Sequence, residues 1–115
     1  MVDGITDVLQ YAVDGLSQQQ QVEANNLSNV ETPGFTAQQV DFESSLQQAL
    51  NSPDGGTASI SVTDSDALPA SNGNNVDTGQ QLVDATQTTL QYQTMVDLLN
   101  AQYRLIQGAA GGSFD

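Results

Sequence analysis

The chain of 115 residues contains no cysteine and no histidine. Without cysteine it can form neither a disulfide nor a thiolate metal site, and without histidine it lacks the commonest general base and a common zinc ligand. Any catalysis would have to rest on carboxylates, and no phosphate-binding, dinucleotide-binding or Gly-x-Ser-x-Gly pattern occurs. We therefore expect no enzyme, no cofactor and no metal ion.

Two pairs of carboxylates remain as candidates for a metal or acid site. Asp64 and Asp66 lie two residues apart, but the residues that complete a calcium loop do not follow them. Asp41 and Glu43 flank the start of an expected helix, where negative charge is favourable in any case. We interpret the first pair as part of a solvated loop and the second as helix capping.

Positive charge is almost absent. Arg104 is the only basic residue and stands against 14 Asp and Glu, so the formal net charge is -13. Nucleic acids and anionic membranes bind Lys and Arg, and we expect neither as a partner. Such a chain assembles best against basic partners or where salt screens its repulsion. A high-salt source is one hypothesis; it predicts that helicity rises with salt, and a salt-independent circular dichroism signal would contradict it.

Long hydrophobic runs are also missing. The first residues, Met1 to Ile5, contain no basic group and no continuous apolar stretch, so they do not form a cleavable secretory signal. No run approaches the roughly 20 apolar residues that span a membrane. We expect a protein that either stays soluble or leaves the cytoplasm by a route that reads no cleaved signal.

The first 30 residues carry the pattern of an amphipathic helix. Ile5, Leu9, Ala12 and Leu16 recur at spacings of three and four, and Asp3 is expected to cap the helix at its start. We expect the helix to end by about Val30, because a Pro-Gly pair follows it.

The end of this helix is rich in asparagine. Asn25, Asn26 and Asn29 are poor helix formers because their side chains bond nearby backbone groups. Pro33 followed by Gly34 fits a type II turn, in which the glycine supplies the positive φ. The residues alone leave two readings equally open: a helix end frayed by polar residues, or a contact surface.

A short helix and a connector follow. Asp41 has the place of an N-cap, and an apolar face begins at Phe42 in a helix that ends near Asn51. Residues 52–75 are rich in Ser, Asp, Gly and Asn and bury too little apolar surface to offset the entropy of ordering. We predict a flexible connector with at most a marginal β-hairpin, its one strand-like alternation lying at 58–62.

The last long element, residues 76–108, is predicted to be a helix. Asp77 or Thr78 can cap it, and a Gly-rich tail at 109–115 ends it. Residues alternating three and four apart form a heptad seam about 25 residues long, made of Leu82, Ala85, Thr89, Tyr92, Val96, Leu99, Tyr103 and Ile106. A second apolar flank beside the seam contains Leu90, Met95, Leu98 and Leu105.

These elements predict a mostly α-helical protein. Residues 1–51 and 76–108 should form one structural domain, in which the two long amphipathic helices pack antiparallel as a coiled-coil-like pair. Because the second flank gives the C-terminal helix more apolar surface than one partner helix covers, we expect the protein to form oligomers.

The segment from Ala24 to Phe35 reads ANNLSNVETPGF and resembles the N-terminal signature of bacterial flagellar rod, hook and hook-associated proteins. The heptad helix at the other end is typical of the same family. Gln38–Leu46, Gly73–Asp77, Leu90–Gln93 and Leu98–Asn100 are similar to its proximal rod proteins. The chain departs from the family at 18–21 and at Thr36, where glutamines and a threonine replace the usual basic residues.

The resemblance implies a structural subunit of the proximal rod of the basal body, which transmits torque from motor to hook. It also implies export by the flagellar type III apparatus, a location in the periplasm, and contacts with FlgC, FliE and other copies of the chain. The residues expected at contacts between subunits are Asn25, Asn26, Leu27, Asn29, Thr32, Pro33, Gly34, Phe35, Leu82, Tyr92, Val96, Leu99, Tyr103 and Ile106.

A different function stays open as the alternative. A small acidic helical chaperone or adaptor for export could hold a basic client on a contiguous negative face. It would fold as a stable monomer, whereas a rod subunit should gain helicity with concentration.

Overall fold

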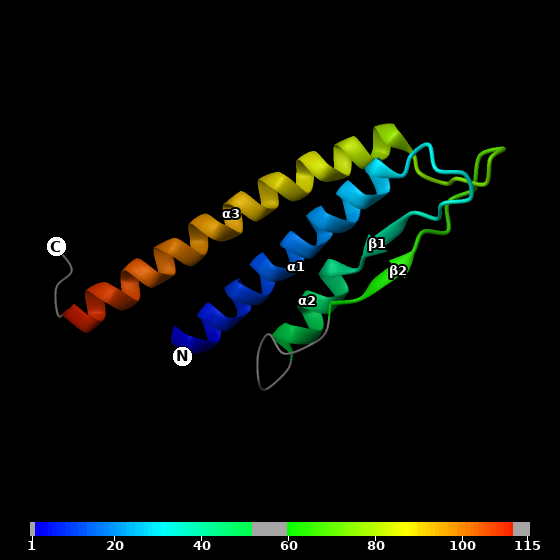
Figure 1. Ribbon diagram of the computed structural model, residues 1–115. Coiled ribbons are helices and arrows are strands. Elements are labelled where there is room, and N and C mark those ends of the chain that lie inside the picture. Colours follow the sequence, from blue (N-terminus) through cyan, green and yellow to red (C-terminus); the bar gives the residue numbers. More distant parts are fainter. Residues whose placement is uncertain (1, 52–59, 112–115) are drawn as a thin grey trace.

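Two long antiparallel helices dominate the protein. The computed structural model describes residues 2–51 and 60–111, in which α1 (Val2–Ser28) lies along α3 (Thr78–Gly111). The molecule is elongated, 64 × 29 × 14 Å, with the start of α1 and the end of α3 at one end and the turn after α1 at the other (Figure 1). The predicted fold class is confirmed: a mostly helical chain, with a short middle helix beside the long pair.

The start of α1 differs from the prediction. Asp3 lies inside the helix, which begins at Val2, so the expectation that Asp3 caps it is wrong. The expected end is confirmed, since α1 stops at Ser28, and the amide of Asn29 closes its last turn on the carbonyls of Asn25 and Asn26, each at 3.2 Å.

The Pro-Gly turn has the predicted geometry. The amide of Phe35 donates to the carbonyl of Thr32 at 3.2 Å, and Gly34 has a φ of 76°. A positive φ at this place in the turn is the mark of type II, and it favours glycine because no Cβ is present to clash.

The turn leads into a small sheet and the middle helix. Strand β1 (Gln38–Val40) pairs antiparallel with β2 (Val62–Asp64), and α2 (Phe42–Leu50) lies between them in sequence. Asp41 precedes α2 as predicted, but its side chain makes no capping hydrogen bond. Its carbonyl instead accepts a hydrogen bond from the Ser45 hydroxyl at 2.7 Å.

The predicted connector divides into two parts. Residues 52–59, with the first two residues of the expected strand at 58–62, lie outside the described residues, and the flexibility of the connector stays a prediction. Residues 60–75 run back along the segment after the Pro-Gly turn, where β2 pairs with β1 and the amide of Ser65 donates to the carbonyl of Ala37 at 2.7 Å. The sequence pattern did not predict this long-range pairing.

The core lies where α1, α2 and α3 meet. Ala12, Leu16 and Phe42 are its buried members, and Val40, Leu46, Tyr92 and Met95 pack against them. Gly15 permits this approach, because a Cβ there would lie 2.7 Å from a ring carbon of Phe42. The core is small, so much apolar surface stays outside it.

Helix α3 begins as predicted and ends later. The Asp77 carboxylate accepts a hydrogen bond from the amide of Gln80 at 3.1 Å and so caps the first turn. The helix continues to Gly111 and does not stop near residue 108. Ala109 and Ala110 explain the extension, because alanine is the strongest helix former.

Candidate functional site

The asparagine-rich turn is the first candidate site, and Asn26 is its most buried member at 1% exposure. Its side-chain amide donates to the carbonyl of Gln38 at 2.7 Å, and its side-chain oxygen accepts from the amide of the same residue at 2.9 Å. Asn26 thus pairs with β1 as a neighbouring strand would. These bonding groups are used within the chain, and a contact of Asn26 with another subunit stays a prediction.

Asn74 fastens the end of α1 to the start of α3. Its side chain, in a residue 4% exposed, donates to the carbonyls of Asn29 and Thr32 at 2.7 and 2.8 Å and accepts from the amide of Val76 at 2.8 Å. The two carbonyls lie just beyond the end of α1, where backbone acceptors lack partners in the helix. One side chain therefore closes the junction between the long helices.

Asn75 ties three further backbone groups together. Its side-chain oxygen accepts from the amide of Ala37 at 2.6 Å, and its side-chain nitrogen donates to the carbonyls of Ser65 and Ala67 at 3.3 and 3.1 Å. We call Asn26, Asn74 and Asn75 the asparagine clamp. Sequence reasoning missed the role of Asn74 and Asn75, although two asparagines just before a helix start were a signal that could have found them.

The other two asparagines of the motif act locally. The side-chain nitrogen of Asn29 donates to the carbonyl of Asn25 at 2.8 Å, and its oxygen accepts from the hydroxyl of Thr32 at 3.1 Å. Neither residue is fully buried. Their contacts with other subunits stay a proposal.

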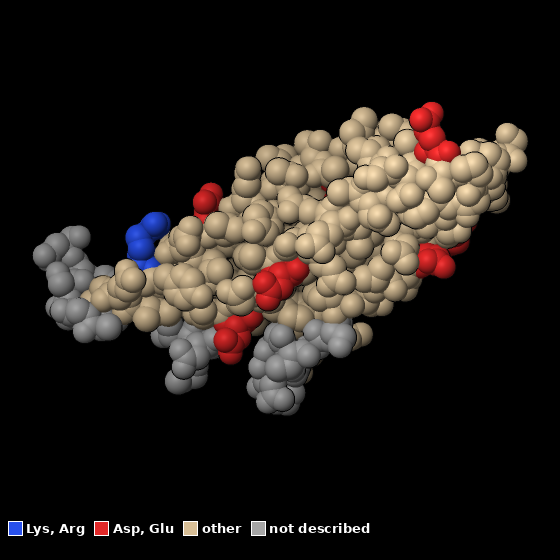
Figure 2. All heavy atoms as spheres, in the orientation of Figure 1, with Lys and Arg blue, Asp and Glu red and all other residues tan. Residues whose placement is uncertain are grey.

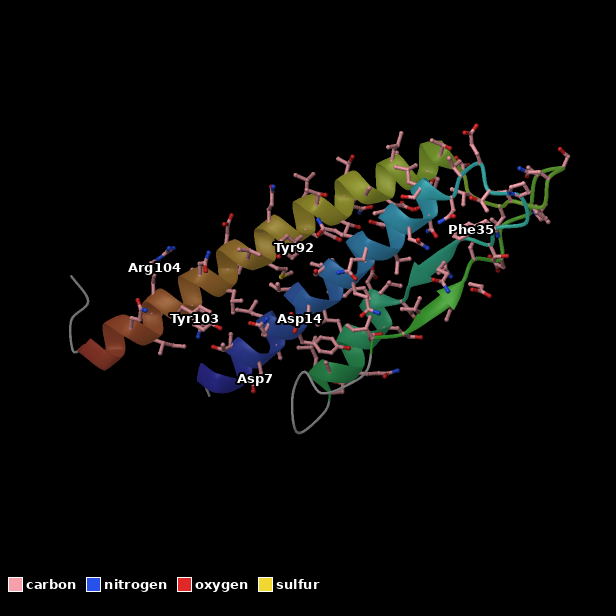
Figure 3. All side chains as sticks on the ribbon, in the orientation of Figure 1. Asp7, Asp14, Phe35, Tyr92, Tyr103 and Arg104 are labelled. Carbon is pink, nitrogen blue, oxygen red and sulfur yellow. The ribbon has the colours of Figure 1, made fainter. Side chains whose placement is uncertain are left out.

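The predicted heptad seam is half correct. Ala85, Tyr92, Leu99 and Ile106 lie on the inner face of α3 that packs toward α1, but their partners along that face are Thr88 and Met95, one residue before the predicted Thr89 and Val96. Leu82, Thr89 and Tyr103 are exposed, and Val96 is half-buried. Figure 3 shows Tyr92 on α3 along the helix pair and Tyr103 farther toward its C-terminal end. The inner face thus keeps half of the predicted seam and takes Thr88 and Met95 in place of the residues that follow them.

Thr88 lies on the inner face, in place of the predicted Thr89, because its hydroxyl forms hydrogen bonds with side chains of α1. The side-chain amide of Gln19 donates to the Thr88 hydroxyl at 2.6 Å, and that hydroxyl donates to a carboxylate oxygen of Glu23 at 3.1 Å. Thr88 is 1% exposed. A polar residue that has two hydrogen-bond partners can be buried at little cost in free energy. A prediction of the seam from hydrophobicity alone therefore misses Thr88.

The outer face of α3 is the second candidate site. It carries a stripe of exposed apolar residues, which we call the outer stripe, made of Val83, Leu90, Leu98 and Leu105. Leu90 and Leu98 are 61% and 48% exposed, which confirms the predicted second flank for these two and for Leu105. Met95 was placed on that flank wrongly, because it packs against the core. Exposed apolar stripes of this kind are typical of contact surfaces.

The predicted contact residues therefore divide by burial. Inside the chain lie Asn26 and Leu99; partly covered are Leu27, Asn29, Phe35, Tyr92, Val96 and Ile106; open to solvent are Asn25, Thr32, Pro33, Gly34, Leu82 and Tyr103. Phe35 and its neighbours lie at the turn end of the molecule (Figure 3). The open residues occur both at this end and along α3.

A polar cavity of about 350 Å³ lies between α1, the small sheet and the start of α3. Glu23, Asp77 and Asp84 bring three carboxylates to its wall, beside amide side chains that include Gln81. Burial raises the pKa of Glu23 above its ordinary value and the charge of Asp84 raises it further, while the hydrogen bond from Thr88 lowers it. The cavity is therefore an unfavourable place for an anion unless a positive group is added.

The described residues contain neither a membrane-spanning helix nor a cluster of metal-binding side chains. None of the helices within 2–51 and 60–111 combines the length and the apolar character needed to cross a membrane. Nor do these described residues contain a group of three or more Asp, Glu, His or Cys side chains able to hold a metal ion.

Comparison with curated proteins finds the flagellar basal body rod protein FlgB in several bacteria. The FlgB of Aeromonas hydrophila is 29% identical over 81% of this chain and 82% of its own length. The FlgB of Yersinia ruckeri is 28% identical over 90% of both chains. This chain resembles FlgB over most of its length. The FlgB of Bacillus subtilis strain 168, 26% identical, extends the match to 97% of each chain. No family model matches this chain.

The similarity to FlgB confirms the resemblance seen in the motifs. Because the match covers most of both chains, it includes the two long helices as well as the asparagine-rich turn. These three relatives carry the name of a rod protein, and none of them carries that of an enzyme or a chaperone.

Proposed function

We propose that this chain is a structural subunit of the rod of the bacterial flagellar basal body. The observation that carries the proposal is the match with FlgB over most of both chains. The outer stripe supports it, because an elongated helical subunit with an uncovered apolar face is suited to packing among neighbours.

Within the rod, the subunit acts mechanically. Side chains of the outer stripe pack against helices of neighbouring subunits, and the interlocked helices carry torque toward the hook. The open residues of the turn, Thr32 to Gly34, contribute a second contact at the other end. The clamp holds the helix junction rigid, so that force passes through packing between subunits and does not bend each one.

The finer assignments belong to the same proposal. The subunit sits in the proximal rod in the periplasm, contacts FlgC, FliE and copies of itself, and is exported by the flagellar type III apparatus. These assignments are supported by the resemblance to rod proteins.

We propose no catalytic role, in keeping with the rod-protein names of the relatives. The alternative of an acidic chaperone has less support. It requires a contiguous acidic face, whereas the acidic side chains in Figure 2 are scattered over the visible surface.

Deletion of the gene in its own bacterium tests the function. We expect cells that lack rods and hooks and do not swim, and that recover when the wild-type gene is supplied. Electron micrographs of normal basal bodies in the deletion strain would contradict the proposal.

A further inference from the structure

We propose that the polar cavity receives the guanidinium group of Arg104 from a second copy of the chain, so that copies join head to tail. This contact deepens the proposed rod function and rests on it, because it names the partner that one surface of the subunit meets.

Two hydrogen-bond acceptors on residues of the cavity wall have no donor in the described part of the chain. Oε1 of Glu23 and Oε1 of Gln81 are buried and have no hydrogen-bond partner among the described residues, and both residues line the cavity. A buried acceptor left unpaired costs about 1–3 kcal/mol, and more when it is charged. A donor group from another chain would remove this cost once the two side chains turn these enclosed oxygens toward the cavity.

The charge at the cavity also calls for a cation. Glu23 and Asp84 repel each other there, and Asp77 adds a third carboxylate to the wall. A guanidinium group suits such a wall, since it carries a permanent positive charge and five N–H donors in a planar fork. Carboxylate and amide oxygens together can use most of those donors.

Arg104 is the one residue of this chain with that chemistry. Its side chain is exposed, and it extends from α3 on the side away from α1 (Figure 3). Within the part of the chain that the structure describes, no ion pair involves it. Figure 2 shows it as an isolated positive group toward one end of the molecule.

Arg104 cannot reach the cavity of its own chain. It lies on the same helix as Asp84 but 20 residues further on (104 minus 84), which is roughly 30 Å at the helical rise of 1.5 Å per residue. The contact must therefore form between copies. Because the two surfaces are different patches, the interface is heterologous and, where rotation does not close a ring, builds an open filament.

Other occupants are conceivable, and the test separates them. A basic side chain of a different rod protein would fill the cavity without linking copies of this chain. The commitment to Arg104 rests on charge: in a chain of net charge -13, most contacts between copies bring like charges together, whereas this one joins the only cation to an acidic wall.

Cross-linking of the purified full-length chain tests the contact directly. The chain has no native cysteine, so paired substitutions give a clean background. Gln80→Cys at the cavity combined with Gln107→Cys near Arg104 should give a ladder of covalent multimers with a short bis-maleimide reagent. Thr86→Cys combined with Gln107→Cys is the matched control, since residue 86 is exposed on α3 but does not line the cavity.

Charge variants in the same double-cysteine chain test the chemistry. Arg104→Gln and Asp84→Asn should each lower the ladder yield by about tenfold or more, as expected when one partner of a buried charge pair is lost. Gln93→Glu and Asp97→Asn change the net charge equally on exposed positions of α3 and should leave the ladder in place. A variant that carries both Arg104→Asp and Asp84→Arg should form the ladder again.

The outcomes are decisive in either direction. Because Arg104 is exposed, Arg104→Gln should keep its helical circular dichroism signal, and an unchanged ladder in that folded variant overturns the proposal. A ladder equally strong in the Thr86 control does so too. If cells build rods with Arg104→Gln but not after deletion of the gene, the rod function holds and the head-to-tail contact is contradicted. If basal bodies are normal after deletion, the rod function itself is contradicted, whatever the ladder shows.

Discussion

The inner and outer faces of α3 belong to one helix but differ in burial. The inner face includes polar Thr88 with Leu99, and it is buried against α1. The outer face presents Leu90 and Leu98 to solvent. A helix with apolar residues on both faces can therefore turn one face inward and leave the other open. In this subunit polar bonds accompany the apolar packing on the inner face, and we propose that the outer stripe meets other chains.

Polar pairing explains the selection. Gln19 and Glu23 on α1 meet the same hydroxyl of Thr88, and this meeting fixes how α3 is placed along α1. Apolar side chains pack in several registers with similar energy, whereas a buried hydroxyl is satisfied in few. The hydrogen bonds of the inner face thus fix the position of α3 along α1. The outer stripe keeps its apolar side chains exposed.

Leu99→Asp should have the largest effect on the isolated subunit. The change buries a charge on the inner face, where Leu99 is 8% exposed, and should lower the free energy of unfolding by about 3 kcal/mol or more. Denaturant unfolding followed by circular dichroism measures it. A stability equal to that of the wild type would mean that the inner face is not buried in solution.

Asn74→Ala should come next, because the clamp fixes the junction that presents one face of α3 to α1. The substitution removes one of two hydrogen-bond donors from each of the Asn29 and Thr32 carbonyls and leaves the Val76 amide without its partner, and it should cost about 2 kcal/mol. Asn25→Ala, in the same motif but exposed, should cost less than about 0.5 kcal/mol. Equal losses in both variants would remove the distinction between clamp and local asparagines.

Glu23→Gln should make the subunit more stable at neutral pH by a smaller amount. Since burial raises the pKa of Glu23, the folded state holds its proton more tightly than the unfolded state, and stability falls as pH rises through that window. The variant should gain most above the raised pKa and nothing below the ordinary value of 4.5. Thermal unfolding across this pH range tests it, with exposed Asp97→Asn as the control for net charge; parallel pH profiles for wild type and Glu23→Gln would contradict it.

Leu98→Asp should change the isolated subunit least and assembly most. The side chain is 48% exposed on the outer stripe, so the free energy of unfolding should stay within about 0.5 kcal/mol of the wild type. Swimming and rod formation should be lost, because a charge then faces neighbouring helices. Together with Leu99→Asp it compares two adjacent residues, one exposed and one buried. Normal swimming would show that the outer stripe is not a contact surface.

Patterns local in sequence predicted much of the architecture. The helix from about residue 3 to 30, the type II turn at Pro33 and Gly34, the start of α2 at Phe42 and the cap at Asp77 all follow from backbone preferences over a few residues. The late end of α3 was missed because Gly108 was weighed above the alanines that follow it.

The candidate site was predicted less well, because it depends on residues far apart in sequence. Asn26 pairs with Gln38 and Asn74 with Asn29, contacts that asparagine content alone could not assign. The sequence motif marked the right segment but suggested outward contacts, whereas part of it turns inward. The pairing of β1 with β2 was missed for the same reason, since three-residue strands carry almost no periodic signal.

The sequence by itself determined the helices, the turn between them and the excess of apolar surface, since each depends on residues a few positions apart. It also determined a net charge of -13 with a single cation, and so a need for basic contacts or screening. Only the tertiary structure decided which face of α3 turns inward. That choice depends on whether Thr88 finds its partners on α1, which the spacing of residues along one helix does not contain.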